Sequence, residues 1–371
     1  MKLGLYVHIP YCAKKCNYCD FKSYAGQLDS TPAYFSMLQQ ELIDKAKDAK
    51  EYVVDSIFIG GGTPSLVDAS YIATVMDTIQ NHYTLTDDCE ITIEANPGTL
   101  TEEKCRIYRA AGINRISLGL QSANEKELAF LGRIHTFQDY LDAVHMATKA
   151  GFTNISTDLI FGIPEQTAEG FLHTLKQVLA LPVTHISAYS LIVEEGTPFY
   201  ELQENGALSL PEESEERTMY WQAIELLQQH GFQQYEISNF AKKGYASRHN
   251  EKYWIGEPYL GFGVAAHSYF NGWRFWNPET IAAYLTEEKP KGYEEITTED
   301  AMQEYMMLGL RRIEGVSKTA FFQKFQQNMT ERFAEQIQKL QNLELLEEME
   351  DSIRLTRKGL DYANLAFMEF V

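Results

Sequence analysis

Short apolar segments alternate with amphipathic segments through the first two-thirds of the chain. The apolar runs are rich in Ile, Val, Leu and Phe, as strands covered on both faces tend to be. They predict strands at residues 3–9, 56–59, 90–94, 115–119, 155–161 and 185–192. The helical patterns between them lie at residues 34–50, 71–83, 102–111, 137–150 and 168–181, with Gly112 and Gly151 where C-caps belong. This alternation predicts an α/β fold with a parallel sheet.

About six strand–helix units are present, and polar motifs recur where the strands end. This arrangement predicts a partial (β/α)6 barrel of the TIM type, with ligands bound at the C-terminal mouth. A doubly wound sheet is the alternative, because it also consists of alternating strands and helices.

The last third of the chain has a different character. A helix at 213–230 and a strand at 233–238 come first, and Lys289-Pro290-Lys291-Gly292 with an acidic stretch at 294–300 then marks a boundary. Helices at 300–312, 318–325 and 331–340, a hairpin of 345–349 with 353–355, and a last helix from Arg357 predict a smaller α+β domain of winged-helix type. We expect it to form a lid or a packing domain over the barrel mouth. The predicted domains are a core barrel at 1–240, a connecting segment at 241–288 and a C-terminal domain at 289–371.

Composition narrows the function classes. The 371 residues carry a net charge of −20, which argues against nucleic-acid binding, since that depends on neutralising phosphates with Lys and Arg. The chain shows no signal-peptide pattern and no apolar run near the ~20 residues that a membrane helix needs. Its five cysteines do not form a secreted disulfide framework. We therefore expect a soluble protein of the cytoplasm.

Three cysteines lie together just after the first predicted strand. Cys12, Cys16 and Cys19 have the spacing C-x3-C-x2-C, and thiolates are soft ligands for zinc, copper(I) or iron–sulfur clusters. A structural zinc site needs four ligands, but no Cys or His follows within the next few residues, and position 21 is Phe. Three cysteines on a four-iron cluster leave one iron open to a small molecule. The alternatives are free core thiols, or a zinc site completed from a distant part of the chain. Cys89 and Cys105 are predicted to be ordinary buried thiols.

Polar residues follow several successive strands. Gly60-Gly61-Gly62-Thr63 could be a tight turn or a nest of backbone N–H groups for the charged end of an amino acid. Further polar residues near strand ends are Glu94, Gln121, Arg133 and Asp158. Their recurrence at the same end of neighbouring strands predicts one shared site.

Together these residues resemble the radical S-adenosylmethionine (SAM) superfamily, and more narrowly its coproporphyrinogen dehydrogenase branch. The resemblance rests on the cysteine motif, Tyr6, Tyr18, Gly61-Gly62-Thr63-Pro64, Glu94, Gln121, Arg133 and Asp158. It implies a [4Fe-4S] cluster on Cys12, Cys16 and Cys19, with SAM on its open iron. It also implies that SAM lies along Tyr6, Tyr18, Gly61, Gly62, Thr63 and Glu94. Residues that match Gln121, Arg133 and Asp158 contact a second SAM in the dehydrogenases, and the number bound here stays open.

The chain departs from the dehydrogenase pattern in two features, and in both it resembles the HemW subfamily of haem chaperones. The dehydrogenases carry a fourth cysteine where this chain has Phe21, and an N-terminal extension that we do not expect here. The run His249-Asn250-x-x-Tyr253-Trp254 has the H-N-x-x-Y-W pattern associated with haem in that subfamily. An imidazole can ligate iron while the two aromatic rings cover a macrocycle, although a capped turn with two core aromatics would look alike. His267 is an alternative ligand.

The resemblance implies that the protein transfers haem to an acceptor protein, and this acceptor could be membrane-associated. It also implies that a flavodoxin- or ferredoxin-type protein donates the electrons. The alternative activity is that of an oxygen-independent coproporphyrinogen III oxidase, which decarboxylates two propionates through a 5′-deoxyadenosyl radical. A structural zinc protein is the third hypothesis.

Overall fold

The computed structural model describes residues 1–286 and 292–371, so the predicted boundary at Lys289-Pro290-Lys291 lies outside the described residues. Its main feature is a sheet of twelve strands, whose order is β14-β13-β12-β11-β1-β4-β5-β6-β7-β8-β10-β9. Six neighbouring strands are parallel and follow the order of the sequence. They are β1 (Lys2–Ile9), β4 (Val53–Gly61), β5 (Leu85–Ala95), β6 (Arg115–Gln121), β7 (Asn154–Phe161) and β8 (His185–Ser190).

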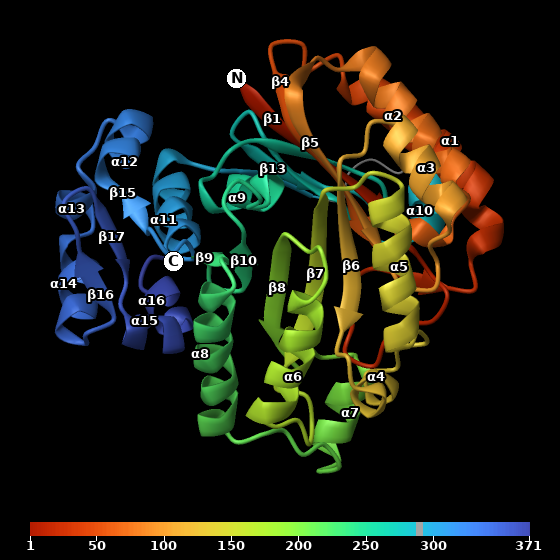
Figure 1. Ribbon diagram of the computed structural model, residues 1–371. Coiled ribbons are helices and arrows are strands. Elements are labelled where there is room, and N and C mark those ends of the chain that lie inside the picture. The colour runs from red at the N-terminus through yellow and green to blue at the C-terminus, as the bar shows by residue number, and fades with distance from the viewer. Residues whose placement is uncertain (287–291) are drawn as a thin grey trace.

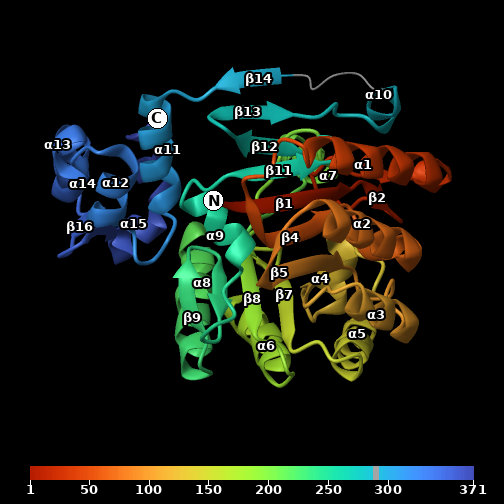
Figure 2. The same ribbon diagram turned by 90° about the horizontal axis from the view of Figure 1, so that it is seen from above.

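The helices between these strands lie on one side of the sheet. They are α1 (Thr31–Lys45), α2 (Ala69–His82), α3 (Glu102–Ala110), α4 (Glu125–Phe130), α5 (Phe137–Lys149) and α6 (Ala168–Leu179). Neighbouring helices pack against each other in the pairs α1–α2, α2–α3 and α3–α5. The strands form an arc with these helices on its outer side (Figures 1 and 2). A doubly wound sheet would place helices on both faces. The arrangement is therefore a partial barrel, as predicted, and the alternative is wrong.

Each parallel strand has an apolar face and a polar face. In β1 the side chains of Leu3, Leu5, Val7 and Ile9 are fully buried in the main hydrophobic core under the helices. Tyr6 and His8 alternate with them and face the inside of the arc, because successive side chains of a strand point to opposite faces. The strand register places Phe58, Thr92, Arg115, Glu94, Ser117 and Asp158 on this same inner face. The inside of the barrel is thus largely polar.

The observed ends of several elements differ from the predicted ones. α1 begins at Thr31 because Pro32 favours the first turn of a helix, and it ends at Lys45 rather than at 50. The strand predicted at 233–238 is divided into β9 (Gln233–Glu236) and β10 (Asn239–Ala241), which pair antiparallel. The helix predicted at 331–340 is two helices, α13 (Met329–Arg332) and α14 (Ala334–Asn342). Gly112 and Gly151 follow α3 and α5 with φ of 93° and 90°, as their capping role requires.

Four strands extend the sheet beyond β1. β11 (Tyr259–Phe262) is parallel to β1, and β12 (His267–Phe270), β13 (Trp273–Trp276) and β14 (Gly292–Glu295) follow antiparallel. The helix α9 (Arg248–Trp254) precedes β11, where the sequence predicted only the haem motif or a capped turn. The helices α7 (Pro198–Glu204), α8 (Glu213–Gln229) and α10 (Ile281–Leu285) complete this part of the chain.

The remaining residues form a unit with its own hydrophobic cluster. It contains α11 (Thr298–Gly309), α12 (Lys318–Phe325), α13, α14, α15 (Arg357–Asp361) and α16 (Ala363–Met368). A sheet of β15 (Val316–Ser317), β17 (Ser352–Leu355) and β16 (Leu346–Glu348) includes the predicted hairpin. Seventeen buried residues between Met302 and Phe370 make up the cluster.

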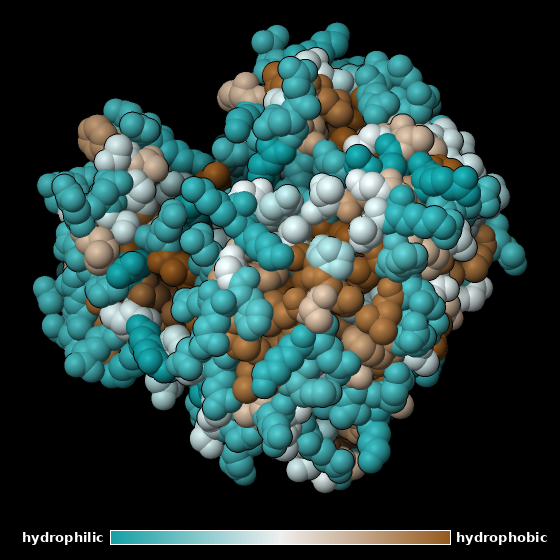
Figure 3. Space-filling view, viewed as in Figure 1, coloured by the Kyte–Doolittle hydropathy of each residue, from teal (hydrophilic) through white to brown (hydrophobic). Residues whose placement is uncertain are grey.

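This C-terminal unit was predicted to cover the barrel mouth, and that prediction is wrong. It packs beside α8 and α9: α11 contacts α9, and Trp221 of α8 donates to Asp361 at 3.0 Å. The carboxyl ends of β6 and β8 lead to α4 and α7, away from this unit (Figure 1). Apolar side chains also reach the surface over the central sheet in Figure 3. Within the two described ranges, no helix combines the length and the apolar character required to cross a membrane.

Candidate functional site

The three thiols lie on a loop at the carboxyl end of β1. Cys12 ends the short strand β2 (Tyr11–Cys12), which pairs with β3 (Tyr24–Ala25) on the other side of the loop. All three thiols are free and partly exposed, whereas Cys89 and Cys105 are buried, as predicted. Burial raises the pKa of the Cys19 thiol to about 11, so a metal must displace a proton there.

The loop is held by residues from other strand ends. The Cys12 Sγ atom lies 3.6 Å from the Thr63 hydroxyl, and Arg133 donates to the Cys16 Sγ atom at 3.4 Å. In the described residues, no three His, Cys, Asp or Glu side chains are close enough to hold a single metal ion. An iron–sulfur cluster gives each thiolate its own iron and tolerates wider spacing, so the donor set fits a cluster better than zinc.

Asn96 connects these residues and was not among the predicted site residues. Its amide nitrogen donates to the Thr63 hydroxyl at 3.0 Å, and its oxygen accepts from Arg133 at 2.5 Å. Arg133 also donates to the Gly119 carbonyl at 2.7 Å. A cavity of about 260 Å³ is lined by Cys16, Thr63, Asn96 and Arg133 together with neighbouring loop residues. The sequence feature that could have identified Asn96 as a site residue is its position in Asn96-Pro97, directly after a predicted strand.

The glycine run approaches β1 closely. A β-carbon on Gly61, whose φ is 112°, would lie 2.5 Å from the His8 ring, and one on Gly62 would lie 2.8 Å from the Tyr11 carbonyl oxygen. The N–H of Gly61 donates to Glu94 at 3.0 Å, and the N–H groups of Gly62 and Thr63 donate to backbone carbonyls at 2.8 Å. These donors are therefore already paired, and the predicted nest of free N–H groups is wrong.

Two carboxylates face the inside of the barrel. Burial, helped by the nearby charge of Asp158, raises the pKa of Glu94 to about 8. Burial also raises the pKa of Asp158, whose oxygens accept from Ser117 at 3.1 and 3.3 Å. The carboxyl of Glu94 is therefore largely protonated at neutral pH, and a cationic ligand group beside it would favour the ionised form.

The remaining predicted SAM residues lie around this centre. The Tyr6 hydroxyl is 2.9 Å from His8 Nδ1, on the inner face of β1. Gln121 adopts a φ of 71°, and a β-carbon at Gly119 would meet Gln121, Asn96 and Arg133 together. Tyr18, on the thiol loop, lies beside Cys16 and Arg133 and also packs against a small cluster of Leu131, Ile160, Ile163 and Phe199.

The predicted haem residues lie at the other end of β1. His249 is 1% exposed, with Nδ1 3.0 Å from the Ser56 hydroxyl and Nε2 2.9 Å from the Tyr253 hydroxyl. Both ring nitrogens are therefore occupied. Burial lowers the pKa of His249 to about 3, so the ring is neutral at pH 7. The guanidinium of Arg311 covers the Trp254 ring at 4.5 Å from its centroid.

Phe58 lies between the predicted haem residues and the predicted SAM residues and contacts both through its ring. Its centroid is 5.4 Å from that of His249 and 6.3 Å from that of Tyr6, in stacked arrangements. The alternative ligand His267 is exposed on β12, where it stacks on Trp276 with the centroids 5.5 Å apart.

Comparison with known proteins agrees with this architecture. Residues 6–178 match the radical SAM superfamily, and residues 296–362 match the HemN C-terminal domain. The haem chaperone HemW of Bacillus subtilis is 38% identical over 99% of this chain and 98% of its own length. The haem chaperone HemW of Lactococcus lactis is 36% identical over 99% of this chain and 96% of its own. The chain belongs to the HemW family.

A solved structure shows the same fold. Coproporphyrinogen III oxidase (HemN) of Escherichia coli superposes with a TM-score of 0.86 over 99% of this chain and 89% of that one, at 24% identity. In this HemW-family chain, the superfamily match contains the three cysteines, the glycine run, Glu94, Gln121, Arg133 and Asp158. The HemN C-terminal match falls in the unit that contains α11 to α16.

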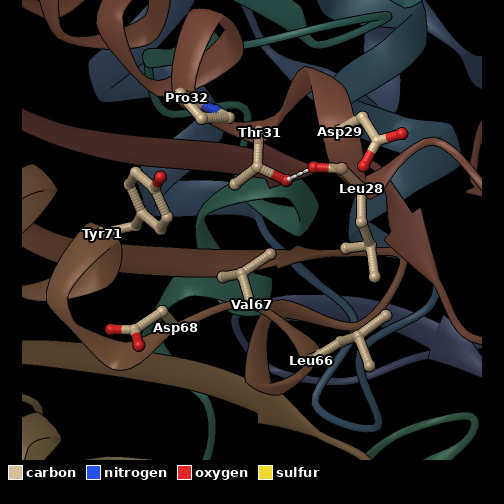
Figure 4. Close-up of a pocket in the computed structure, with 8 residues that line it drawn as sticks. All are labelled: Leu28, Asp29, Thr31, Pro32, Leu66, Val67, Asp68 and Tyr71. Carbon is tan, nitrogen blue, oxygen red and sulfur yellow. Dashed lines mark hydrogen bonds between the residues drawn. The ribbon is translucent and has the colours of Figure 1, made fainter.

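A further surface pocket lies where α1 and α2 begin. Figure 4 shows it between Leu28, Leu66 and Val67, with the carboxyl groups of Asp29 and Asp68 at its edges. None of the eight residues that line it is a predicted site residue, so this pocket is separate from the thiols of the HemW-family site.

The close approach at Gly61 leads to a prediction about stability. We expect Gly61→Ala to lower the free energy of unfolding by about 2–5 kcal/mol. The substitution adds both a strained backbone and an overlap with the His8 ring. The matched control is Gly151→Ala, which has a φ of 90° but no neighbouring atom within 4 Å, and should cost only ~1–2 kcal/mol. Urea unfolding of both variants checks this, and equal losses would mean that His8 moves aside.

Proposed function

We propose that this chain is a haem chaperone of the radical SAM type, which binds haem and transfers it to an acceptor protein. The observation that carries the proposal is the match to HemW of Bacillus subtilis over nearly the full length of both chains. The intact His249-Asn250-x-x-Tyr253-Trp254 run supports it. We further propose a location in the cytoplasm, an electron donor of the flavodoxin or ferredoxin type, and an acceptor that can be membrane-associated.

In this proposal Cys12, Cys16 and Cys19 would hold a [4Fe-4S] cluster, and the predicted SAM residues at the neighbouring strand ends would hold SAM. When bound, the pair supplies one-electron reductive cleavage of SAM. The protein's part is to hold and orient the ligand. Arg133 keeps the Cys16 sulfur next to Asn96 and Thr63. Glu94 offers a buried carboxyl for the amino group of SAM, and Tyr6 and Asp158 lie on the same inner face.

The domain division at residues 240 and 288 stays a prediction. The main sheet continues through β14 to Glu295, and the second hydrophobic cluster begins at Met302. A boundary slightly later than 288 would agree with both observations.

The second candidate function is that of an oxygen-independent coproporphyrinogen III oxidase. It is favoured by the resemblance of the fold to HemN of Escherichia coli. Against it stands Phe21, which is 65% exposed on the thiol loop where the dehydrogenases resembled above carry a fourth cysteine.

One sample of anaerobically reconstituted protein can test both functions. We expect haemin to produce a saturable shift of the Soret band, because the chain resembles the haem chaperone HemW of Bacillus subtilis over nearly its full length. We expect no protoporphyrinogen from coproporphyrinogen III when SAM and reductant are added. Turnover would establish the oxidase instead, and a missing Soret shift would reject the chaperone. Metal analysis of the same sample tests the zinc hypothesis, which predicts zinc without iron or sulfide.

A further inference from the structure

A cleft separates the extended sheet from the C-terminal unit. It measures about 380 Å³ and lies between α9 and strands β11 to β13 on one side and α11 and α12 on the other. Four tyrosines line it, namely Tyr253, Tyr259, Tyr269 and Tyr305, and Met307 adds an apolar side chain. Figure 3 shows the surface hollowed between these two parts of the molecule. Pockets of this size with aromatic walls suit flat organic ligands.

Two cations lie in the same cleft. Lys324 of α12 donates to the backbone carbonyls of Gly256 at 2.7 Å and Ile255 at 3.3 Å. Among the residues that the structure describes, no carboxylate lies within ion-pair distance of its ammonium group, so one N–H donor stays available to an anion. Arg274 of β13 pairs with Glu304 of α11 at 2.7 Å and lies 3.5 Å from Glu294.

The acidic residues of the cleft have cationic partners. Glu257 accepts from Lys252 at 2.6 Å, Lys252 also pairs with Asp55 at 2.6 Å, and Glu304 accepts from Arg274. Of the cations that line the cleft, Lys324 is the one with no carboxylate within ion-pair distance among the described residues, and the charge of Glu257 acts on it from farther away. A ligand that complements the cleft is flat, apolar across its face and anionic at its edge.

We propose that this cleft holds the porphyrin ring of haem, with a propionate on Lys324 and the tyrosine-lined walls against the ring. The inference rests on the proposed function and gives it a location. It also gives Tyr253 of the H-N-x-x-Y-W run a role in haem binding. Tyr253 lines the cleft, and its hydroxyl contacts His249, which lies behind it.

The test compares haemin with its dimethyl ester, which has the same ring without carboxylates. We expect Lys324→Gln in the full-length chain to weaken haemin binding about tenfold, the usual effect of losing a charge-assisted hydrogen bond. It should leave binding of the ester unchanged within twofold. Tyr269→Ala, which shortens a wall of the cleft, should weaken both ligands equally. Lys339→Gln is the control, because Lys339 is an exposed lysine of α14 that pairs with Glu369 outside the cleft.

Each result distinguishes this proposal from the proposed function. If the wild type binds haemin and Lys324→Gln and Tyr269→Ala both bind it equally well, haem lies elsewhere and the chaperone function stands. Equal weakening of haemin and ester by Lys324→Gln would also overturn the assignment of the propionate. If the wild type binds no haemin, both proposals fail. Circular dichroism of each variant establishes that it is folded.

Discussion

Cys16→Ala protein is expected to hold no [4Fe-4S] cluster after anaerobic reconstitution, while the wild type holds about four iron and four sulfide ions. The Cys16 sulfur has Arg133 as its neighbour and is partly exposed, so its loss leaves the hydrophobic core intact. Two thiols cannot replace three, because the cluster then has too few protein ligands. Iron and acid-labile sulfide analysis measures the effect, together with the charge-transfer absorption of the cluster.

The matched control for this prediction is Cys105→Ala. Cys105 is a fully buried thiol of α3 within the main core, and no predicted site residue lies on that helix. We expect it to keep a full cluster and to lose ~1 kcal/mol of stability, since only a small buried group is removed. A full iron content in Cys16→Ala would mean that this cysteine is not a ligand. Iron loss in both variants would mean that the assay reports stability rather than ligation.

The barrel could be predicted because apolar strands alternate with amphipathic helices and polar motifs recur where the strands end. The apolar runs predicted strands covered on both faces, whereas the structure covers one face with helices and lines the other with polar groups. Runs such as Leu3-Gly-Leu-Tyr-Val-His-Ile carry that pattern locally. The shared site of Glu94, Gln121, Arg133 and Asp158 could be predicted as well, because parallel strands place their carboxyl ends along one edge. Helix starts at Thr31 and Ala69 differ by only a few residues from the predicted positions.

The position of the C-terminal unit could not be predicted in the same way. Its contacts join residues far apart in sequence, such as Trp221 with Asp361, and no local pattern specifies such a pairing. The same holds for His249, whose partner Ser56 is 193 residues away. The sequence could identify His249 as a potential ligand, but only the fold shows that both of its nitrogens are already hydrogen bonded.

Haem ligation by His249 must therefore compete with Tyr253. The imidazole can reach an iron only after Nε2 releases the Tyr253 hydroxyl, which costs about 1 kcal/mol for a hydrogen bond of this kind. We expect Tyr253→Phe, which keeps the ring and removes the hydroxyl, to bind haemin roughly fivefold more tightly than the wild type. Haemin titration followed at the Soret band measures this change.

His249→Ala is expected to abolish the spectrum of histidine-ligated haem. It also empties a space between Ser56, Phe58 and Tyr253, at a cost of about 2–4 kcal/mol in the free energy of unfolding. Ser56→Ala is the control, because it removes the partner of Nδ1 and leaves Nε2 unchanged. It should keep the wild-type spectrum. If Tyr253→Phe and His249→Ala both bind haemin with the affinity and spectrum of the wild type, the iron takes its ligand from another residue, and the buried imidazole serves to join α9 to β4.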